Sequence, residues 1–399
     1  MNAQQKSVLF IGNSYTYSNN FPDLFYQLSL SGGDSVIYDS YAPGGYTFQL
    51  HSQDQNTISK INQQNWDYVV LQGQSQQAAL DTPYVIANVF PYARMLDSLI
   101  HDNDSCSQTV FFMTWGRKYG DSQFCSSYPP VCTYSGMQDQ LRGRYLQMAY
   151  DNGAICAPAG VAWQNAIAAG FAPDLFSGDG SHPSLHGSYL TACVFYATLF
   201  RKTPVGLNYC GGLPQSEAQQ LQAFAELIVM DSLNHWNAGV YYPSATLFYN
   251  NISGSSYAFQ TTSGYASYFW DFGDGNTLNG GAMESHIYQS TGSFPVSVTV
   301  SNGCHETVLY DTVIVTTVGE EALNVSPFTM YPNPADHEIT MDYGTFFQYE
   351  IKDASGRKID HGSAFGKKSL NVAAFSDGLY LIKVFTGETT IVRRFIVKH

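Results

Sequence analysis

Short apolar runs alternate with longer segments of helical periodicity between residues 7 and 236. Each run ends in glycine or polar residues, as buried strands do, and the longer segments repeat apolar residues every three or four positions. Strands separated by helices predict a parallel sheet covered on both faces, in one α/β domain over residues 1–238. The clearest strand candidates are 7–11, 67–72 and 109–114, and the clearest helix candidates are 84–100 and 215–234.

The pattern changes after Trp236, where apolar and polar residues begin to alternate with a period of two. This alternation, in segments rich in Ser, Thr, Tyr and Gly, predicts two β-sandwich domains. They are expected over 239–318 and 319–399, with a Gly-Glu-Glu linker at 319–321 and a terminal hairpin that joins the runs 379–385 and 391–397 around Thr386.

Composition narrows the range of partners. The 399 residues carry a formal net charge of −14, which disfavours binding to nucleic acid or to an anionic membrane surface. Aromatic residues make up 15% of the chain, enough to fill buried cores. No run of 18 apolar residues occurs, so we expect no transmembrane segment.

The seven cysteines are irregularly spaced, without a Cys-x-x-Cys pair, which argues against a zinc site built on cysteine pairs. Cys125 and Cys132 flank a short loop and are expected to form a local disulfide, which indicates an oxidising compartment and export. Cys304 stands apart from the six cysteines of the first domain, among which the pairing stays open.

Three residues suggest acyl-transfer chemistry. Ser14 follows the first strand directly, and ligands of open parallel sheets bind beyond the carboxyl ends of the strands. Far downstream, Asp179 and His182 precede a helix that is expected to begin at Pro183. In a Ser–His–Asp triad the imidazole takes the serine proton, and the carboxylate holds the imidazole and stabilises its charged form.

The motifs Gly-Asn-Ser14 and Asp179-x-x-His182-Pro resemble those of the SGNH (GDSL-type) hydrolases, over roughly residues 7–205. The resemblance implies a flavodoxin-like three-layer α/β/α domain and a serine esterase with Ser14, Asp179 and His182 as catalytic residues. It also implies an oxyanion hole formed by the N–H groups of Ser14 and Gly45 and by the side chain of Gln74. Gln74 departs from the family pattern, which has asparagine in a Gly-x-Asn-Asp block.

Each of these residues also has a plain structural interpretation. Ser14 and Gly45 would then belong to ordinary turns, Asp179 would cap a loop beside a packed His182, and Gln74 would bond neighbouring backbone. A metal site that includes His186 is disfavoured, because Pro183 stands where zinc-protease helices carry a general-base glutamate. We therefore expect no metal and no cofactor.

Trp115 and Arg117 follow the strand at 109–114 and are expected at the same edge of the sheet. Trp115 would stack on a sugar and Arg117 would bind an acidic group of the substrate. The alternative is that Trp115 packs at the rim and that Arg117 forms a structural ion pair.

The two C-terminal segments carry resemblances of their own. Tyr268-Phe-Trp-Asp-Phe-Gly-Asp-Gly275 resembles a PKD-type immunoglobulin-like domain, with Trp270 in the core and with Asp271 and Asp274 shaping a turn; a calcium role for these aspartates is a subordinate alternative. Tyr331-Pro-Asn-Pro334 and the closing strand run resemble the C-terminal sorting domain of the type IX secretion system of Bacteroidota. This implies partnership with that machinery, export across the outer membrane to the surface or medium, and a signal peptide in the precursor.

We therefore predict a secreted esterase that removes small acyl groups, above all acetyl, from carbohydrates. The alternatives are a short-chain lipid or general carboxylesterase, and a surface glycan-binding protein without turnover.

Overall fold

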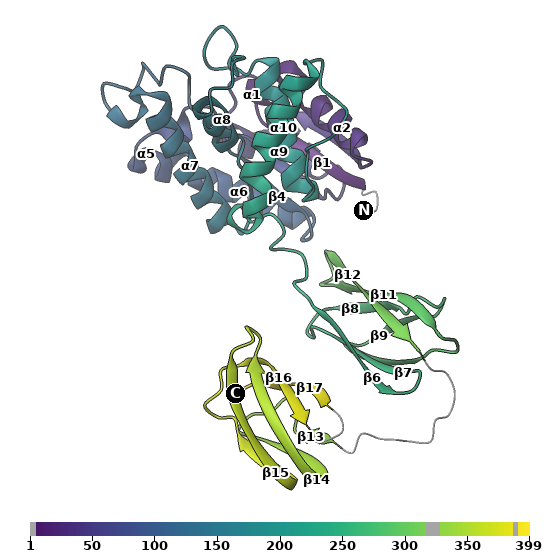
Figure 1. The fold of residues 1–399 in the computed structure, drawn as a ribbon. Helices are drawn as coiled ribbons and strands as arrows, with labels where there is room; N and C mark the ends of the chain where they lie inside the picture. The colour runs from purple at the N-terminus through teal and green to yellow at the C-terminus, as the bar shows by residue number, and fades with distance from the viewer. Residues whose placement is uncertain (1–4, 317–327, 386–389) are drawn as a thin grey trace. The chain divides into compact units, whose positions relative to one another are not determined.

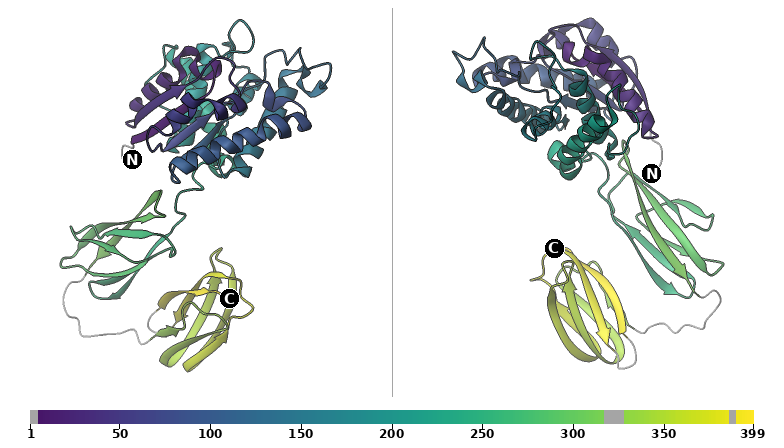
Figure 2. Two further views of the ribbon diagram at one scale, coloured as in Figure 1. Left: turned by 180° about the vertical axis from the view of Figure 1, so that it is seen from behind. Right: turned by 45° about the horizontal axis from the view of Figure 1, so that its top comes forward.

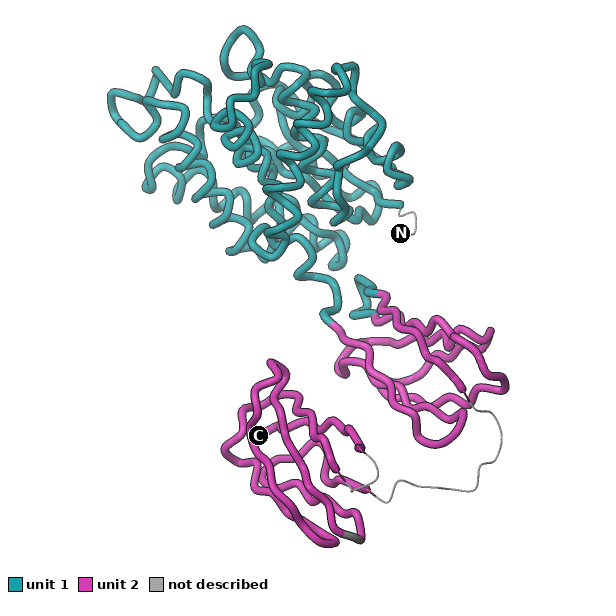
Figure 3. The backbone as a smooth tube through the Cα atoms, in the orientation of Figure 1, with its two compact units in different colours: residues 1–244, 301–307 teal, residues 245–300, 308–399 magenta. Residues whose placement is uncertain are grey.

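The computed structural model describes residues 5–316, 328–385 and 390–399. The chain divides into two compact units (Figure 3). The first unit contains residues 1–244 with 301–307, and the second contains residues 245–300 with 308–399.

The first unit is built on a five-stranded parallel sheet in the order β2-β1-β3-β4-β5. β1 is paired on both sides, so the chain winds outward from it in two directions, and ligands of such sheets bind where the direction reverses. The α/β prediction is confirmed. The strands are β1 Gln5–Ile11, β2 Ser35–Tyr41, β3 Tyr68–Leu71, β4 Gln108–Phe112 and β5 Ile155–Ala157.

Helices cover both faces of this sheet (Figures 1 and 2). α9 contacts α2 and α10 in one layer, and α6 contacts α4 and α7 in the other. The α-helices are α1 Ser14–Tyr17, α2 Phe21–Ser31, α3 Phe48–Gln53, α4 Gln55–Ile61, α5 Thr82–Asn88, α6 Phe90–Asn103, α7 Tyr134–Asp151, α8 Ala159–Ala168, α9 Leu185–Phe200 and α10 Gln215–Val229. The 3₁₀ turns are η1 Ser18–Asn20, η2 Gln77–Ala79, η3 Pro129–Cys132 and η4 Met230–Trp236.

The core of the first unit surrounds α9, whose residues from Gly187 to Phe200 are all buried. A helix that is apolar around its whole circumference is stable only when other elements enclose it. The ring of Phe195 packs edge-on against Phe112 of β4, with the ring centroids 5.0 Å apart. The helix that follows the Asp179–His182 loop is therefore anchored directly on the sheet.

Two helix predictions need correction. The helix expected over 84–100 is two helices, α5 and α6, because the first turn of α6 contains Pro91, which has no N–H to continue the preceding helix. The helix expected at Pro183 begins at Leu185 instead, and the Ser184 Oγ accepts a hydrogen bond from the Gly187 N–H at 3.3 Å.

The second unit begins with two antiparallel sheets, in the orders β10-β7-β6 and β12-β11-β8-β9. Trp270 is fully buried in their common core, as predicted, and Asp271 and Asp274 accept hydrogen bonds from the N–H groups of Gly273 and Asn276. The strands are β6 Leu247–Ser253, β7 Ser256–Thr261, β8 Ser267–Asp271, β9 Thr277–Gly280, β10 Met283–Ile287, β11 Gly292–Ser301 and β12 Glu306–Val315.

The last segment forms another antiparallel β domain. The long strand β14 pairs with β13, β15 and β16, and β16 pairs with β17 as predicted. The expected linker at 319–321 and the tip of the terminal hairpin lie outside the described residues. The strands are β13 Thr329–Tyr331, β14 Glu338–Asp353, β15 Lys358–Asn371, β16 Gly378–Phe385 and β17 Thr390–Val397.

Two disulfides lie in the first unit. The predicted Cys125–Cys132 bond is present. Cys304 does not stand alone, since it pairs with Cys106 across 198 positions of the chain. Among the described residues, no helix has the length and apolar character needed to cross a membrane.

Candidate active site

The sequence-predicted residues collect at the carboxyl edge of the parallel sheet. Ser14 is the first residue of α1 and follows β1 after two residues. Asp179 and His182 lie in the loop that leads into α9. Because the carboxyl ends of parallel strands share one edge, chain segments that are 168 positions apart meet there.

Ser14, His182 and Asp179 form one continuous chain of hydrogen bonds. The His182 Nε2 lies 2.8 Å from the Ser14 Oγ, and the His182 Nδ1 lies 2.5 Å from the Asp179 Oδ2. A carboxylate can only accept, so the Nδ1–H donates to Asp179 and the Nε2 is left to accept the Ser14 proton. This is the tautomer that general-base catalysis requires.

Asp179 is held in its charged form. Burial alone would raise its pKa, but hydrogen bonds from the His182 side chain, from the Ser177 hydroxyl and from the N–H groups of Ser181 and His182 keep the pKa well below its usual range. These donors also fix the position of the carboxylate. Asp179 is therefore anionic at neutral pH and aligned to stabilise an imidazolium on His182.

The loop that carries Ser14 is held by the buried side chain of Gln72. The Gln72 Oε1 accepts hydrogen bonds from the Asn13 N–H at 2.9 Å and from the Thr16 Oγ1 at 3.0 Å. A Cβ on Gly12 would lie 2.2 Å from the Thr16 Oγ1 and 2.8 Å from the Gln72 Oε1, so this close packing requires glycine.

Asn13 connects the loop of Ser14 to the two loops expected to bind the oxyanion. Its Nδ2 donates to the backbone oxygen of Tyr46 at 3.0 Å and to that of Gly73 at 3.3 Å. Gly45, which precedes Tyr46, has a φ of +74° in a turn closed by a Tyr46 N–H to Pro43 O hydrogen bond. The loops of Gly45 and Gln74 are thus brought beside Ser14.

The Gln74 side chain is engaged with its own loop. Its Nε2 lies 3.0 Å from the Gln76 Oε1, and its Oε1 accepts from the N–H groups of Gln76 and Gln77. These are the neighbouring contacts of the plain structural interpretation. A role at the oxyanion requires its amide to turn away from Gln76 and toward the substrate.

The sugar-stacking role expected for Trp115 is corrected by the structure. Its indole ring is 1% exposed and stacks on Tyr15 at 5.0 Å and on Trp163 at 3.8 Å between centroids. Both faces are covered, so neither is left for a ligand. The Trp115 Nε1–H donates to the backbone oxygen of Ser181 at 3.0 Å, so this residue supports the loop of Asp179 and His182, the candidate catalytic loop.

Tyr15 is the second support of that loop. Its hydroxyl shares a hydrogen bond of 2.6 Å with the Ser181 Oγ, and its ring lies edge-on to His182 at 5.4 Å. Burial raises the pKa of the Tyr15 phenol, which therefore remains protonated at neutral pH. Tyr15 follows Ser14 in sequence and so couples the position of Ser14 to that of His182.

Arg117 lies next to the loop of Gln74. One guanidinium nitrogen lies 3.8 Å from the Asp121 Oδ2, and the other donates to the Ser75 Oγ at 3.4 Å. Asp121 is 1% exposed. The guanidinium is thus paired with a buried carboxylate, which is the structural alternative named for it.

His186, in the first turn of α9, is engaged in contacts with neighbouring side chains. Its Nε2 lies 2.7 Å from the Glu217 Oε2, and its ring packs against Phe171. Among the described residues, no group of three or more His, Cys, Asp or Glu side chains is arranged to bind a metal ion.

Sequence reasoning missed Gln72 and His51 and left Asn13 and Tyr15 without a role. His51 is fully buried, with its Nε2 2.8 Å from the Gly12 backbone oxygen and its Nδ1 2.9 Å from the Thr57 Oγ1. Asn13 and Tyr15 are the sequence neighbours of Ser14, and this adjacency was the signal that could have identified them. Gln72 and His51 gave none, because the partners that connect them to the Ser14 loop, Asn13 and Gly12, lie 59 and 39 positions away.

Family comparisons identify the two C-terminal domains. Residues 251–316 match the PKD domain family, and residues 329–398 match the secretion system C-terminal sorting domain family. Both predicted resemblances are confirmed. The sorting domain indicates export across the outer membrane to the cell surface or beyond, by the secretion machinery that reads it.

The first unit is also similar to several solved structures. A DUF4886 family protein from Bacteroides uniformis shares 19% identity with a TM-score of 0.49, covering 57% of this chain and 96% of that one. A putative SGNH hydrolase from Slackia heliotrinireducens shares 26% identity with a TM-score of 0.39, covering 49% and 97%. A putative GDSL-like lipase from Parabacteroides merdae shares 16% identity with a TM-score of 0.36, covering 55% and 98%. No curated protein sequence matches the chain.

Proposed function

We propose that this protein is an exported serine esterase that hydrolyses small acyl esters, above all acetyl esters of carbohydrates. The observation that carries the proposal is the unbroken hydrogen-bond chain from the Ser14 Oγ through His182 to Asp179. A surface serine beside a histidine is common, but a serine whose proton acceptor is oriented by a second, anionic side chain is the arrangement that nucleophilic catalysis requires.

The reaction proceeds in two displacements. Ser14 Oγ attacks the ester carbonyl while His182 Nε2 takes its proton, and Asp179 stabilises the resulting imidazolium. The tetrahedral intermediate collapses to an acyl-serine as His182 returns the proton to the departing alcohol. A water then attacks the acyl-serine, with His182 again taking a proton, and the carboxylic acid leaves with Ser14 restored.

The proposed oxyanion hole consists of the N–H groups of Ser14 and Gly45 and the side-chain amide of Gln74. The hydrogen bonds from Asn13 to Tyr46 and Gly73 support this assignment, because they bring all three donor segments to the nucleophile. One such donor contributes about 3 kcal/mol of transition-state stabilisation.

The openness of the triad supports a small acyl group on a bulky alcohol. The side chains of His182 and Asp179 are 38% and 49% exposed. An open mouth admits a polymer that presents a short ester, whereas a long acyl chain gains its binding energy from an enclosed apolar cleft. Export through the sorting domain supports a substrate outside the cell.

Hydrolysis of p-nitrophenyl acetate by the full chain, beside its Ser14→Ala variant, tests the proposal. We expect turnover that falls by at least about 1,000-fold in the variant, since the nucleophile and base act as one unit. Ser31→Ala, at the end of α2, is the matched control and should keep full activity. EDTA should leave the rate unchanged.

Equal rates for the wild type and Ser14→Ala, with both folded by circular dichroism, would contradict the triad. Turnover that rises steeply from the acetyl to the decanoyl ester would instead support a general carboxylesterase. A folded wild type without any esterase activity would leave glycan binding without turnover as the remaining alternative.

A further inference from the structure

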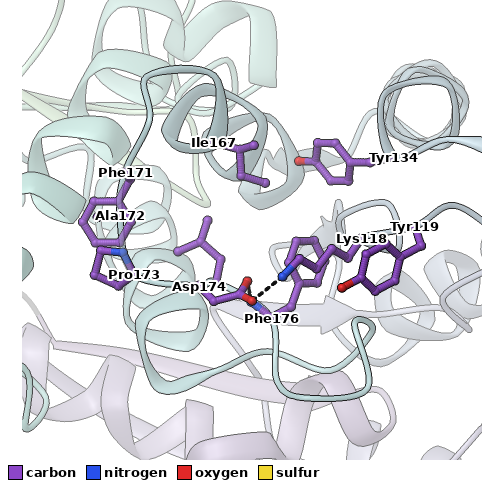
Figure 4. A pocket seen from close by; sticks show the side chains of 10 residues that line it. Lys118, Tyr119, Tyr134, Ile167, Phe171, Ala172, Pro173, Asp174 and Phe176 are labelled. Atoms are coloured by element: carbon purple, nitrogen blue, oxygen red, sulfur yellow. Dashed lines mark hydrogen bonds and ion pairs between the residues drawn. The ribbon is translucent and has the colours of Figure 1, made fainter.

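A cavity of about 480 Å³ lies in the first unit, lined by side chains from the segments 118–134 and 167–176 (Figure 4). Its wall is largely apolar, with Ile167, Phe171, Leu175 and Phe176 among the lining residues. The volume is within the range of roughly 300–1,000 Å³ that small-molecule sites occupy. Neither the triad nor the proposed oxyanion hole uses these side chains.

Polar side chains also line the cavity, among them those of Lys118, Asp174 and Tyr134. Lys118 and Asp174 form an ion pair across the cavity, and their side chains are 36% and 50% exposed (Figure 4). Tyr134 also lines the cavity, and its hydroxyl is buried without a hydrogen-bond partner among the described residues. A buried hydroxyl without a partner is costly, so a ligand that bonds to it gains the full value of that bond.

Tyr119 adds an open aromatic surface at the mouth of the cavity. Its side chain is 78% exposed, which is unusual for a residue of this size. An exposed tyrosine ring next to fixed hydrogen-bonding groups fits a ligand with one apolar face and several hydroxyls. A pyranose ring has this character, because its axial C–H groups form an apolar face and its hydroxyls point outward.

The charges favour a neutral ligand. Lys118 and Asp174 cancel each other, so the cavity offers no net charge to a carboxylated or sulfated sugar. The chain as a whole carries a net charge of −14, which repels acidic polysaccharides. The ion pair still offers both donors and acceptors to neutral hydroxyl groups.

The cavity is tied to the catalytic loop by backbone hydrogen bonds. The Lys118 N–H donates to the Gly180 oxygen at 2.8 Å, and the Ser184 N–H donates to the Leu175 oxygen at 2.8 Å. The Ser177 N–H donates to the oxygen of His182, also at 2.8 Å. A ligand in the cavity would therefore bind beside the loop that carries Asp179 and His182.

We propose that this cavity is a subsite for a neutral sugar ring of the substrate, distinct from the ring that carries the ester. The proposal rests on the proposed function, since it assigns the alcohol part of the substrate to a carbohydrate chain. Tyr119 provides the stacking surface, Tyr134 donates its free hydroxyl, and the Lys118–Asp174 pair bonds ring hydroxyls. A small ester without a sugar chain does not reach the subsite.

Calorimetric titration of the full-length Ser14→Ala protein with xylohexaose, cellohexaose and mannohexaose, each up to about 10 mM, tests the subsite. We expect at least one hexaose to bind. Tyr119→Ala should weaken that binding about tenfold, and Tyr134→Phe about threefold or more. Removing the Tyr134 hydroxyl breaks no bond within the described structure, so that variant keeps its fold.

Tyr150→Ala is the matched control, because Tyr150 is 62% exposed on α7 and does not line the cavity. It should bind the hexaose as the parent does. The subsite proposal is overturned if none of the three hexaoses binds, or if Tyr119→Ala and Tyr134→Phe both bind as tightly as Tyr150→Ala does.

The proposed function has its own, separate readout. In the background with an intact Ser14, the control Tyr150→Ala should leave kcat/KM for p-nitrophenyl acetate unchanged. Esterase activity without hexaose binding would therefore remove the subsite and leave the esterase. Hexaose binding without esterase activity would contradict the proposed esterase and leave the cavity as a site that binds glycans.

Discussion

Single buried polar side chains set the geometry around Ser14. Gln72 and Asn13 together connect β1, the turn after β2 and the loop after β3. His51 bonds to the oxygen of Gly12, two residues before Ser14, and completes this network. Each of these groups is buried and hydrogen-bonded, which makes the position of Ser14 costly to change.

His51 should make the stability of the first unit depend on pH. Burial lowers its pKa from 6.5 to about 4, so the unfolded chain binds a proton between these values that the folded chain does not. Stability therefore falls as the pH drops below 6.5, by roughly 2 kcal/mol between pH 7 and 4.5 from this residue. Urea unfolding of the wild type and of His51→Gln at the two pH values measures this contribution.

His51→Gln is expected to be less stable than the wild type at pH 7 and to lose less stability on acidification. His101→Gln, at an exposed position of α6, controls for the removal of an imidazole as such. An unchanged loss of stability in His51→Gln would show that the buried ring does not resist protonation.

At the scale of elements, the position of the loop that carries Asp179 and His182 depends on how closely α9 packs against the neighbouring segments. A Cβ on Gly187 would lie 2.4 Å from the Leu175 oxygen and 2.4 Å from the Trp163 Cζ2. The absence of a side chain at this position lets the first turn of α9 approach the 174–177 segment. That segment in turn bonds to His182 and Ser184.

Gly187→Ala should therefore destabilise the protein by about 2 kcal/mol or more and lower kcat, because backbone has to move near the triad. Gly143→Ala is the contrasting helix variant, since a Cβ there meets nothing within 4 Å. It should stabilise the protein by about 0.5–1 kcal/mol without changing kcat. Chemical denaturation and p-nitrophenyl acetate kinetics measure both effects, and a similar response of the two variants would contradict the packing argument.

At the scale of the whole molecule, the chain combines an α/β unit with two β domains of confirmed type. The Cys106–Cys304 bond closes a loop of 198 positions, whereas Cys125–Cys132 closes a loop of only 7. The segment 301–307, which runs from the end of β11 to the start of β12 and contains Cys304, is part of the first unit.

Removing the long-range disulfide should cost more stability than removing the short one. In the chain-entropy treatment, Cys106→Ser with Cys304→Ser loses up to about 5 kcal/mol, and Cys125→Ser with Cys132→Ser up to about 2.5 kcal/mol. Urea unfolding of the two double variants under oxidising conditions gives the comparison. The reverse order would show that strain or residual structure outweighs loop closure.

Local patterns were sufficient for the class of each domain and for selecting the three residues of the proposed triad, which the structure joins by hydrogen bonds. Buried strands and amphipathic helices are visible as apolar periodicity, and Ser14, Asp179 and His182 stand in short motifs whose chemistry is specific. The same holds for Trp270, whose neighbours in sequence form the motif that predicts its buried place.

Long-range packing decided the rest. Four features depend on segments that lie far apart in the chain. They are the covered faces of Trp115, the hydrogen bonds from Gln72 and His51 to the Ser14 loop, the pairing of Cys304 with Cys106, and the cavity beside the candidate catalytic loop. Residue type and local spacing carry no information about such partners, because burial and hydrogen bonding belong to the folded neighbourhood. Trp115 illustrates this, since an indole after a strand is equally suited to a rim and to a core, and only the rings of Tyr15 and Trp163 exclude the rim.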